Sequence, residues 1–153
     1  MIDLNKLGDF FILDLANNHQ GDLDHALKII DAFGKKIESF EIEATIKLQF
    51  RNLESYIHKS INSSSSDNSY VKRFQSTKLN KSDYSKIINK IKSYNLKTMS
   101  TPFDEDSFSL INELDIDIIK IASASANDKS LLLETKKTNK PCVISVGGKD
   151  IEQ

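Results

Sequence analysis

The sequence lacks a large excess of charge of either sign. Its 153 residues hold 21 Lys and Arg against 22 Asp and Glu, which gives a formal net charge of -1. Proteins that bind nucleic acid or membrane surfaces through charge carry a basic excess or a basic patch. We therefore expect no nucleic-acid and no membrane partner, although a local pair of lysines could still bind a small anion.

Cysteine and long apolar runs are also scarce. The single cysteine, Cys142, has no second cysteine with which to form an internal disulfide, which fits a reducing compartment. No apolar stretch approaches the length of a membrane span. Acidic residues flank the short N-terminal apolar run, a pattern that does not suit a signal peptide. These absences predict a soluble, cytoplasmic protein.

Common catalytic and metal-binding motifs are missing as well. The sequence has no P-loop, no GxGxxG, no zinc motif and no Ser-His-Asp order. Its three histidines, His19, His25 and His58, are not spaced as metal ligands. The residues alone therefore predict no metal site.

Five short apolar segments are expected to form strands. Most are apolar on both faces, as is typical of strands in a parallel sheet that helices cover. They span Phe10–Leu15, Ala44–Phe50, Leu96–Ser100, Asp117–Ala122 and Pro141–Val146.

Segments with helical periodicity lie between these strands. Asp22 is expected to cap the first helix, and Ser82 or Asp83 the second. The predicted helices span Leu23–Glu38, Tyr84–Tyr94, Phe108–Leu114 and Ser130–Thr138. The alternation of strands and helices predicts an α/β fold with a right-handed, mainly parallel sheet.

The predicted units account for only part of a closed barrel. A (β/α)8 TIM barrel needs roughly 250 residues, so we expect about five βα units of such a barrel over residues 1–153. The polar segment Asn62–Asn68 is predicted to be a flexible surface loop at about residues 60–70 within this one domain. The exposed sheet edges favour a homodimer or pairing with a second half-barrel chain.

Two lysines lie inside predicted strands, where an unpaired ammonium group is costly. By alternation Lys47 shares a face with Gln49, and Lys120 shares a face with Ile118 and Ala122. Both lysines on inward faces would suggest a bound phosphate or carboxylate. Edge-strand positions or salt bridges would explain them equally well.

Small polar residues follow the predicted strands, at the end where α/β barrels place their active sites. They could donate hydrogen bonds to an anion, although the same residue types also favour turns and caps. Asp22 and Asp104 are expected to be caps. The segments are Ala16–Asp22, Ser100–Asp104, Ser123–Ser125 and Ser145–Gly148.

In chain order these pieces resemble the N-acetylneuraminate (sialic acid) synthase family. The matching segments read LDLANNHQGD, KLQF, STPFD, KIAS and KPCVISVGG. The family condenses phosphoenolpyruvate with an N-acetylated hexosamine, typically N-acetylmannosamine, to give a nine-carbon ulosonic acid and phosphate. The resemblance implies transferase activity of this kind.

The resemblance also implies roles for single residues. Phosphoenolpyruvate would be bound by Lys47, Thr101, Lys120, Ser123 and Ser145. Asp14 and His19 would be the catalytic residues. Asn18 and Gln49 would lie on the sugar side.

The sequence departs from the family pattern at several positions. Asp14 replaces a glutamate, Ala124 and Ser125 replace a glycine and an acid, and Val146 replaces a threonine. The family's divalent metal, Mn or Mg, is held by two histidines on later strands, and its C-terminal antifreeze-like domain follows the barrel. We therefore expect no metal bound by residues 1–153 alone, and little synthase activity.

Two other functions fit the same residues. A Schiff-base aldolase could use Lys120 or Lys47 as nucleophile, because a desolvated lysine has a lowered pKa. A non-catalytic half barrel could bind anions or assemble with a partner.

Overall fold

The sheet has five parallel strands in sequential order. The computed structural model describes residues 10–40, 42–58, 60–61 and 67–148. Its strands are β1 (Phe10–Asp14), β2 (Glu43–Phe50), β3 (Lys97–Pro102), β4 (Ile118–Ile121) and β5 (Cys142–Ile144). Each strand pairs with the next one along the chain, whereas a doubly wound sheet reverses its strand order. The expected half of a (β/α)8 barrel is confirmed.

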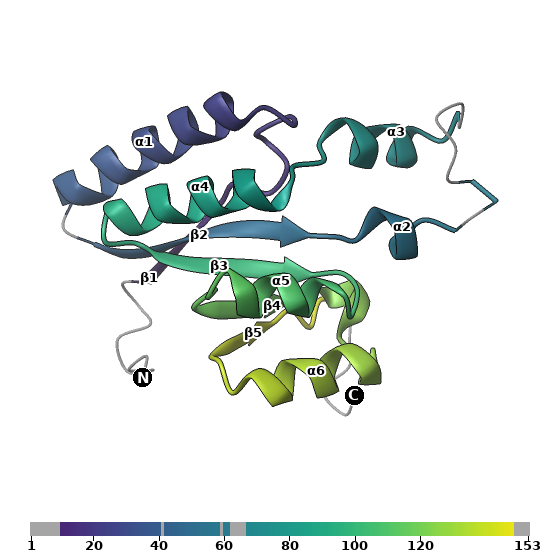
Figure 1. The fold of residues 1–153 in the computed structure, drawn as a ribbon. Helices are drawn as coiled ribbons and strands as arrows, with labels where there is room; N and C mark the ends of the chain where they lie inside the picture. Colours follow the sequence, from purple (N-terminus) through teal and green to yellow (C-terminus); the bar gives the residue numbers. More distant parts are fainter. Residues whose placement is uncertain (1–9, 41, 59, 62–66, 149–153) are drawn as a thin grey trace.

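Four of the helices between these strands were predicted, and they lie close to the predicted bounds. They are α1 (Leu23–Phe40), α4 (Lys81–Ser93), α5 (Ser107–Glu113) and α6 (Lys129–Thr138). Figure 1 shows α1 and α4 side by side along β1, β2 and β3, with α5 and α6 near β4 and β5. No helix in the described part of the chain is long and apolar enough to cross a bilayer.

The helix caps are confirmed in one case and corrected in another. The backbone N–H of His25 donates to Oδ1 of Asp22 at 3.0 Å, as expected for a cap. Neither Ser82 nor Asp83 caps α4. The cap is Asn80, whose side chain accepts from the N–H of Asp83 at 2.9 Å, because α4 begins earlier than predicted.

The connection between β2 and β3 holds more structure than predicted. It contains α2 (Leu53–Tyr56) and α3 (Ser69–Ser76), and a 3-10 turn, η2 (Ser123–Ser125), follows β4. Of the predicted loop at 60–70, residues 62–66 lie outside the described residues. Its last two residues begin α3 instead, because Asn68 caps that helix and Val71 buries its apolar side.

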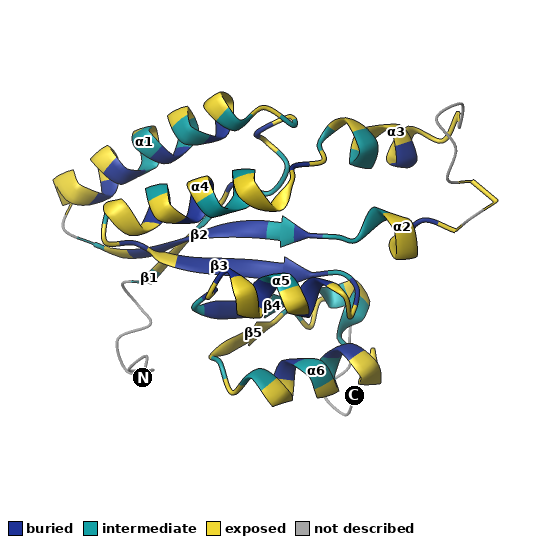
Figure 2. Ribbon diagram, viewed as in Figure 1, coloured by how far each residue is buried: buried dark blue, intermediate teal, exposed yellow. Residues whose placement is uncertain are grey.

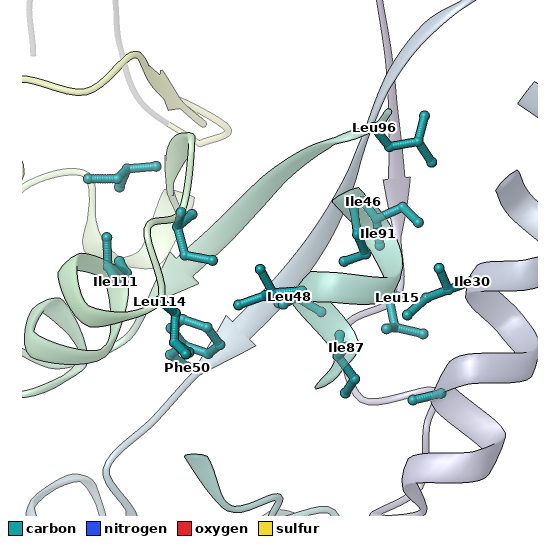
Figure 3. Close-up of a cluster of buried hydrophobic side chains, with 14 of the residues drawn as sticks. Leu15, Ile30, Ile46, Leu48, Phe50, Ile87, Ile91, Leu96, Ile111 and Leu114 are labelled. Atoms are coloured by element: carbon teal, nitrogen blue, oxygen red, sulfur yellow. The ribbon is translucent and has the colours of Figure 1, made fainter. Parts of the chain in front are cut away.

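One face of the sheet packs against the helices. Every second residue of β2, from Ala44 to Phe50, is buried there (Figure 2). Figure 3 shows Leu48 near Ile87 and Ile91 of α4, and Ile30 of α1 beside Leu15. Burying each Leu or Ile side chain contributes about 1.5–3 kcal/mol. Because this apolar cluster occupies the face of the sheet that packs against the helices, only the opposite face can carry a binding site.

Helices α1 and α4 approach closely at Gly34. A Cβ atom at this position would overlap the ring of Tyr94, which follows α4. The Tyr94 hydroxyl donates to Oδ1 of Asp31 at 2.5 Å, and Lys90 pairs with the same oxygen at 2.6 Å. Glycine is therefore required here by the close packing of two helices.

Candidate anion-binding site

Strand register brings both polar and apolar side chains together on the face that points away from the helices. Asp14 of β1 pairs with Lys47 of β2, Lys47 pairs with Met99, and Met99 pairs with Ile118. Side chains two residues apart on a strand point to the same face, so Gln49, Thr101 and Lys120 lie on this face as well. We call this face the inner face; it carries Asp14, Lys47, Gln49, Met99, Thr101, Ile118 and Lys120.

Lys47 forms an ion pair within the inner face. Its Nζ lies 2.8 Å from Oδ2 of Asp14. The Lys47 side chain is only 10% exposed, whereas that of Asp14 is 52% exposed. A carboxylate that solvent can reach therefore neutralises part of the Lys47 charge. A salt bridge was one of the explanations of Lys47 that the sequence could not distinguish.

Lys120 lies near Lys47 and differs from it in having no such partner. In the described part of the chain, no hydrogen bond or ion pair is made by its ammonium group. Burial lowers the pKa of Lys120 from its ordinary value, and the positive charge of Lys47 lowers it further. Asp14 acts in the opposite direction. Two lysines therefore repel each other on one face, where a bound anion would relieve both.

Thr101 provides a hydroxyl to the same face. It is 2% exposed, and its Oγ1 has no hydrogen-bond partner among the described residues. A buried hydroxyl without a partner costs free energy that a ligand can recover. Continuing the register of Met99 with Ile118 and Ser100 with Ile119 by one residue places Thr101 opposite Lys120, the lysine that lacks a partner.

Ser123 and Ser145 lie at the carboxyl ends of β4 and β5. Ser123 begins η2, and the backbone N–H of Ser145 donates to the carbonyl of Ile121 at 3.0 Å. Both residues are half-buried. The two β-strand ends thus bring these serines to the same end of the sheet as the other predicted residues.

His19 is buried in the turn after β1. It is 1% exposed, and its Nδ1 accepts a hydrogen bond from the N–H of Gly21 at 3.0 Å. Because Nδ1 is the acceptor, the neutral ring carries its proton on Nε2. Burial lowers the pKa of His19, and nearby His25 lowers it further. The ring is therefore a neutral Nε2–H donor at pH 7.

The other turn residues are placed by backbone contacts. Asn18 is exposed, and its side-chain amide donates to the carbonyl of Asp14 at 3.5 Å. Asp104 accepts from the N–H of Asn52 at 2.8 Å and from the N–H of Ser107 at 2.8 Å. Asp104 thus ties the turn after β3 to the turn after β2, whereas the N-cap residue of α5 is Asp106 and not Asp104 as expected.

Sequence reasoning missed Arg51, which directly follows β2. Its guanidinium lies 3.9 Å from the ring centre of Phe103, 4.6 Å from that of Phe74 and 5.9 Å from that of Tyr56. Its Nη2 donates to Oε1 of Gln49 at 3.0 Å. An arginine at the carboxyl end of a barrel strand was the available signal, but two of its three aromatic neighbours, Phe74 and Phe103, lie far along the chain.

The described residues do not gather ligands for a metal ion. No three His, Cys, Asp or Glu side chains among them come together in a metal-binding cluster. The Nδ1 of His19 is already an acceptor for a backbone N–H. The divalent metal that the resemblance implies thus has no fitting donor set in this part of the chain.

The fold and the inner face define part of a (β/α)8 barrel whose interior carries a cationic cluster beside an unpartnered hydroxyl. The chain belongs to the NeuB family, whose family model matches residues 37–153.

Several known proteins resemble the chain over most of its length. N,N'-diacetyllegionaminic acid synthase of Campylobacter jejuni is 29% identical over 142 residues, covering 89% of this chain and 41% of that protein. A crystal structure from Chromobacterium violaceum, described as spore coat polysaccharide biosynthesis protein E, superposes with a TM-score of 0.88 at 39% identity, covering 94% of this chain and 43% of its own.

A sialic acid synthetase has a similar fold. The citrate-bound N-acetylneuraminic acid synthetase of Leptospira borgpetersenii gives a TM-score of 0.76 at 25% identity, over 94% of this chain and 46% of that chain. The present chain thus spans less than half of the length of each of these proteins.

Proposed function

We propose that the inner face binds phosphoenolpyruvate in a synthase that condenses it with an N-acetylated amino sugar to a nine-carbon ulosonic acid. Carbon C3 of phosphoenolpyruvate attacks the sugar aldehyde, water adds at C2, and phosphate leaves with cleavage of the C2–O bond. Membership of the NeuB family supports this reaction class, as do the synthases among the similar proteins.

The observation that carries the proposal is the pair of lysines on one face. Burial and then the positive charge of Lys47 lower the pKa of Lys120, and the half-exposed carboxylate of Asp14 acts in the opposite direction. Phosphoenolpyruvate carries a phosphate and a carboxylate, so one molecule would meet both ammonium groups. A preorganised pair of cations in a partly desolvated face binds such an anion more strongly than the same charges in water.

The remaining residues would position the substrates. Thr101, Ser123 and Ser145 would donate hydrogen bonds to the anion and fix its orientation. The neutral His19, with its proton on Nε2, would donate to an oxygen on the sugar side. Asp14 would accept from a sugar hydroxyl through the oxygen that does not pair with Lys47, and Asn18 and Gln49 would add further contacts on that side.

Calorimetric titration of phosphoenolpyruvate into the 153-residue chain tests the proposal. We expect binding to weaken at least tenfold in Lys47→Ala and in Lys120→Ala, because each substitution removes one positive charge that faces the bound anion. Lys97→Ala is the matched control, since Lys97 is an exposed lysine at the opposite end of β3. Binding that is absent, or that survives the double Lys47→Ala/Lys120→Ala change, contradicts the proposal.

A Schiff-base aldolase is the second candidate, favoured by the lowered pKa of Lys120. A lysine with a lowered pKa gives up its proton more easily, and the neutral amine is the nucleophile towards a carbonyl carbon. Borohydride reduction in the presence of pyruvate and an N-acetylated sugar would then leave a stable adduct on Lys120, detectable by mass spectrometry of peptides. The synthase proposal predicts no such adduct.

We also propose that the outer strands pair with another polypeptide, either a second copy or a second half barrel. Within the described sheet, β1 and β5 each pair on one side only. Phe11 and Ile12 of β1 are exposed, as are Val143 and Ile144 of β5. Light scattering should therefore report a species larger than a 17.3 kDa monomer, and a monodisperse monomer would contradict this.

A further inference from the structure

Arg51 is held between aromatic rings rather than in an ion pair. Phe103, Phe74 and Tyr56 come from three separate segments and surround its guanidinium. No ion pair to Arg51 is found among the described residues, and its Nε is buried without a hydrogen-bond partner. Stacking on ring faces fixes the plane of a guanidinium group, which an ammonium group cannot reproduce.

The contact from Arg51 decides how the Gln49 carboxamide is oriented. A guanidinium group has donors only, so the Gln49 atom at 3.0 Å from Nη2 has to be the carbonyl oxygen Oε1. The amide NH2 of Gln49 is then directed away from Arg51. Gln49 shares the inner face with Lys47 by register, and the residue is partly exposed.

We propose that Arg51 is a positioning residue that fixes the Gln49 carboxamide as a hydrogen-bond donor to an acceptor oxygen of the sugar substrate. The identity of the sugar as the ligand rests on the proposed function, but the orientation of the Gln49 carboxamide does not depend on it. The aromatic rings keep Arg51 from turning towards the anion that the two lysines bind. Arg51 therefore acts on the sugar side through Gln49, and phosphoenolpyruvate binding depends on the lysines.

Substitutions separate the charge of Arg51 from its geometry. Arg51→Lys keeps the charge but loses the planar fork, and Arg51→Met loses both. Phe103→Leu keeps the arginine and removes the nearest ring. Lys78→Met is the matched control, because Lys78 is an exposed cation that lines the same cavity of about 240 Å³ as Gln49 and Arg51.

The experiment has a readout that needs no ligand. In 15N-labelled chain, the side-chain NH2 of Gln49 is assigned by its loss in Gln49→Glu, and its mobility is measured by the heteronuclear NOE. We expect a rigid NH2 in the wild type and in Lys78→Met, and a mobile one in Arg51→Lys, Arg51→Met and Phe103→Leu. An equally rigid Gln49 NH2 in Arg51→Lys overturns the positioning role.

Ligand titrations then test the link to the sugar. Loss of one well-placed hydrogen bond predicts about a tenfold weaker affinity for N-acetylmannosamine in Arg51→Lys and Arg51→Met. Phosphoenolpyruvate affinity should stay within about twofold in Arg51→Lys, which also shows that the variant is folded. Unchanged sugar affinity in Arg51→Lys overturns the inference. A wild-type chain that binds neither ligand overturns the proposed function, while the NH2 readout still decides whether Arg51 positions Gln49.

Discussion

The Nζ of Lys47 lies 2.8 Å from Oδ2 of Asp14, across the first two strands of the sheet. The lysine is nearly buried and the carboxylate is half-exposed, so the pair is neither a typical surface salt bridge nor a fully desolvated one. The carboxylate supports the lysine when no ligand is bound, and it competes with any anion that approaches.

Asp14→Asn should strengthen phosphoenolpyruvate binding while it weakens the fold. Removing one negative charge near the anion lowers its electrostatic free energy by about 1 kcal/mol at an exposed site, which is roughly a fivefold lower dissociation constant. Unfolding in urea should show a loss of about 1 kcal/mol, because Lys47 loses its partner. Glu105→Gln, an exposed charge change in the turn after β3, should alter neither quantity. Weaker phosphoenolpyruvate binding in Asp14→Asn would contradict the competition.

Phosphoenolpyruvate affinity should fall as the pH rises towards 10.5, the ordinary pKa of lysine. The pKa of Lys120 is lowered by burial and by Lys47, so Lys120 loses its charge before an ordinary lysine does. Titrations from pH 7.5 upwards should show this decline in the wild type and a smaller one in Lys120→Met. The free energy of unfolding should behave in the opposite way, because the unfolded chain holds more protons in this range and stability then rises with pH. An identical pH profile in Lys120→Met would exclude Lys120 as the titrating group.

Stability should decrease on mild acidification because of His19. Its pKa is lowered from 6.5 by burial and by His25, so the unfolded chain takes up a proton first as the pH falls below 6.5. The contribution of His19 to the free energy of unfolding is present in full above pH 6.5. It declines by at most about 1.4 kcal/mol per pH unit as the pH falls, and it levels off below the lowered pKa. Urea unfolding between pH 7.5 and pH 5 should show a shallower decline in His19→Asn than in the wild type. His58→Asn, at an exposed histidine, should keep the wild-type slope.

Gly34→Ala should destabilise the protein, although the same change within a helix normally stabilises it by about 0.5–1 kcal/mol. The new methyl group would overlap the ring of Tyr94, which its hydrogen bond to Asp31 holds in place. Overpacking of this kind costs about 1–3 kcal/mol. Thermal unfolding monitored by circular dichroism gives the sign, with Lys35→Ala on the exposed side of α1 as control. A stabilised Gly34→Ala variant would show that the helices separate easily at this point.

The sequence predicted the strands and their alternation with helices because these follow from local patterns, but it left Lys47 and Lys120 open between an inward anion site and edge-strand or salt-bridge positions. Period-two alternation decides the face of a strand residue, and the apolar residues of β2 leave its lysine only one side. The Asp14–Lys47 pair required the register between two strands, which alternation alone does not fix.

Two features were beyond local patterns. Helix α3 lies in a polar segment, and its formation depends on the Asn68 cap and on Val71 packing against the rest of the protein. The aromatic surroundings of Arg51 come from α2, α3 and the turn after β3, which only the tertiary fold brings together. The roles of the predicted substrate-binding residues remain predictions.

Gly21, whose φ of +78° suits glycine, leaves no room for a Cβ atom because the carbonyl of Ser76 lies against it. The N–H of Gly21 also donates to His19, so one short turn touches both the buried imidazole and the end of α3. Movement of α3, which carries Phe74, would therefore be transmitted mechanically to the His19 turn. A chain of direct contacts through α3 and the Gly21 turn thus connects the Phe74 ring beside Arg51 to the His19 imidazole, although the two are distant in sequence.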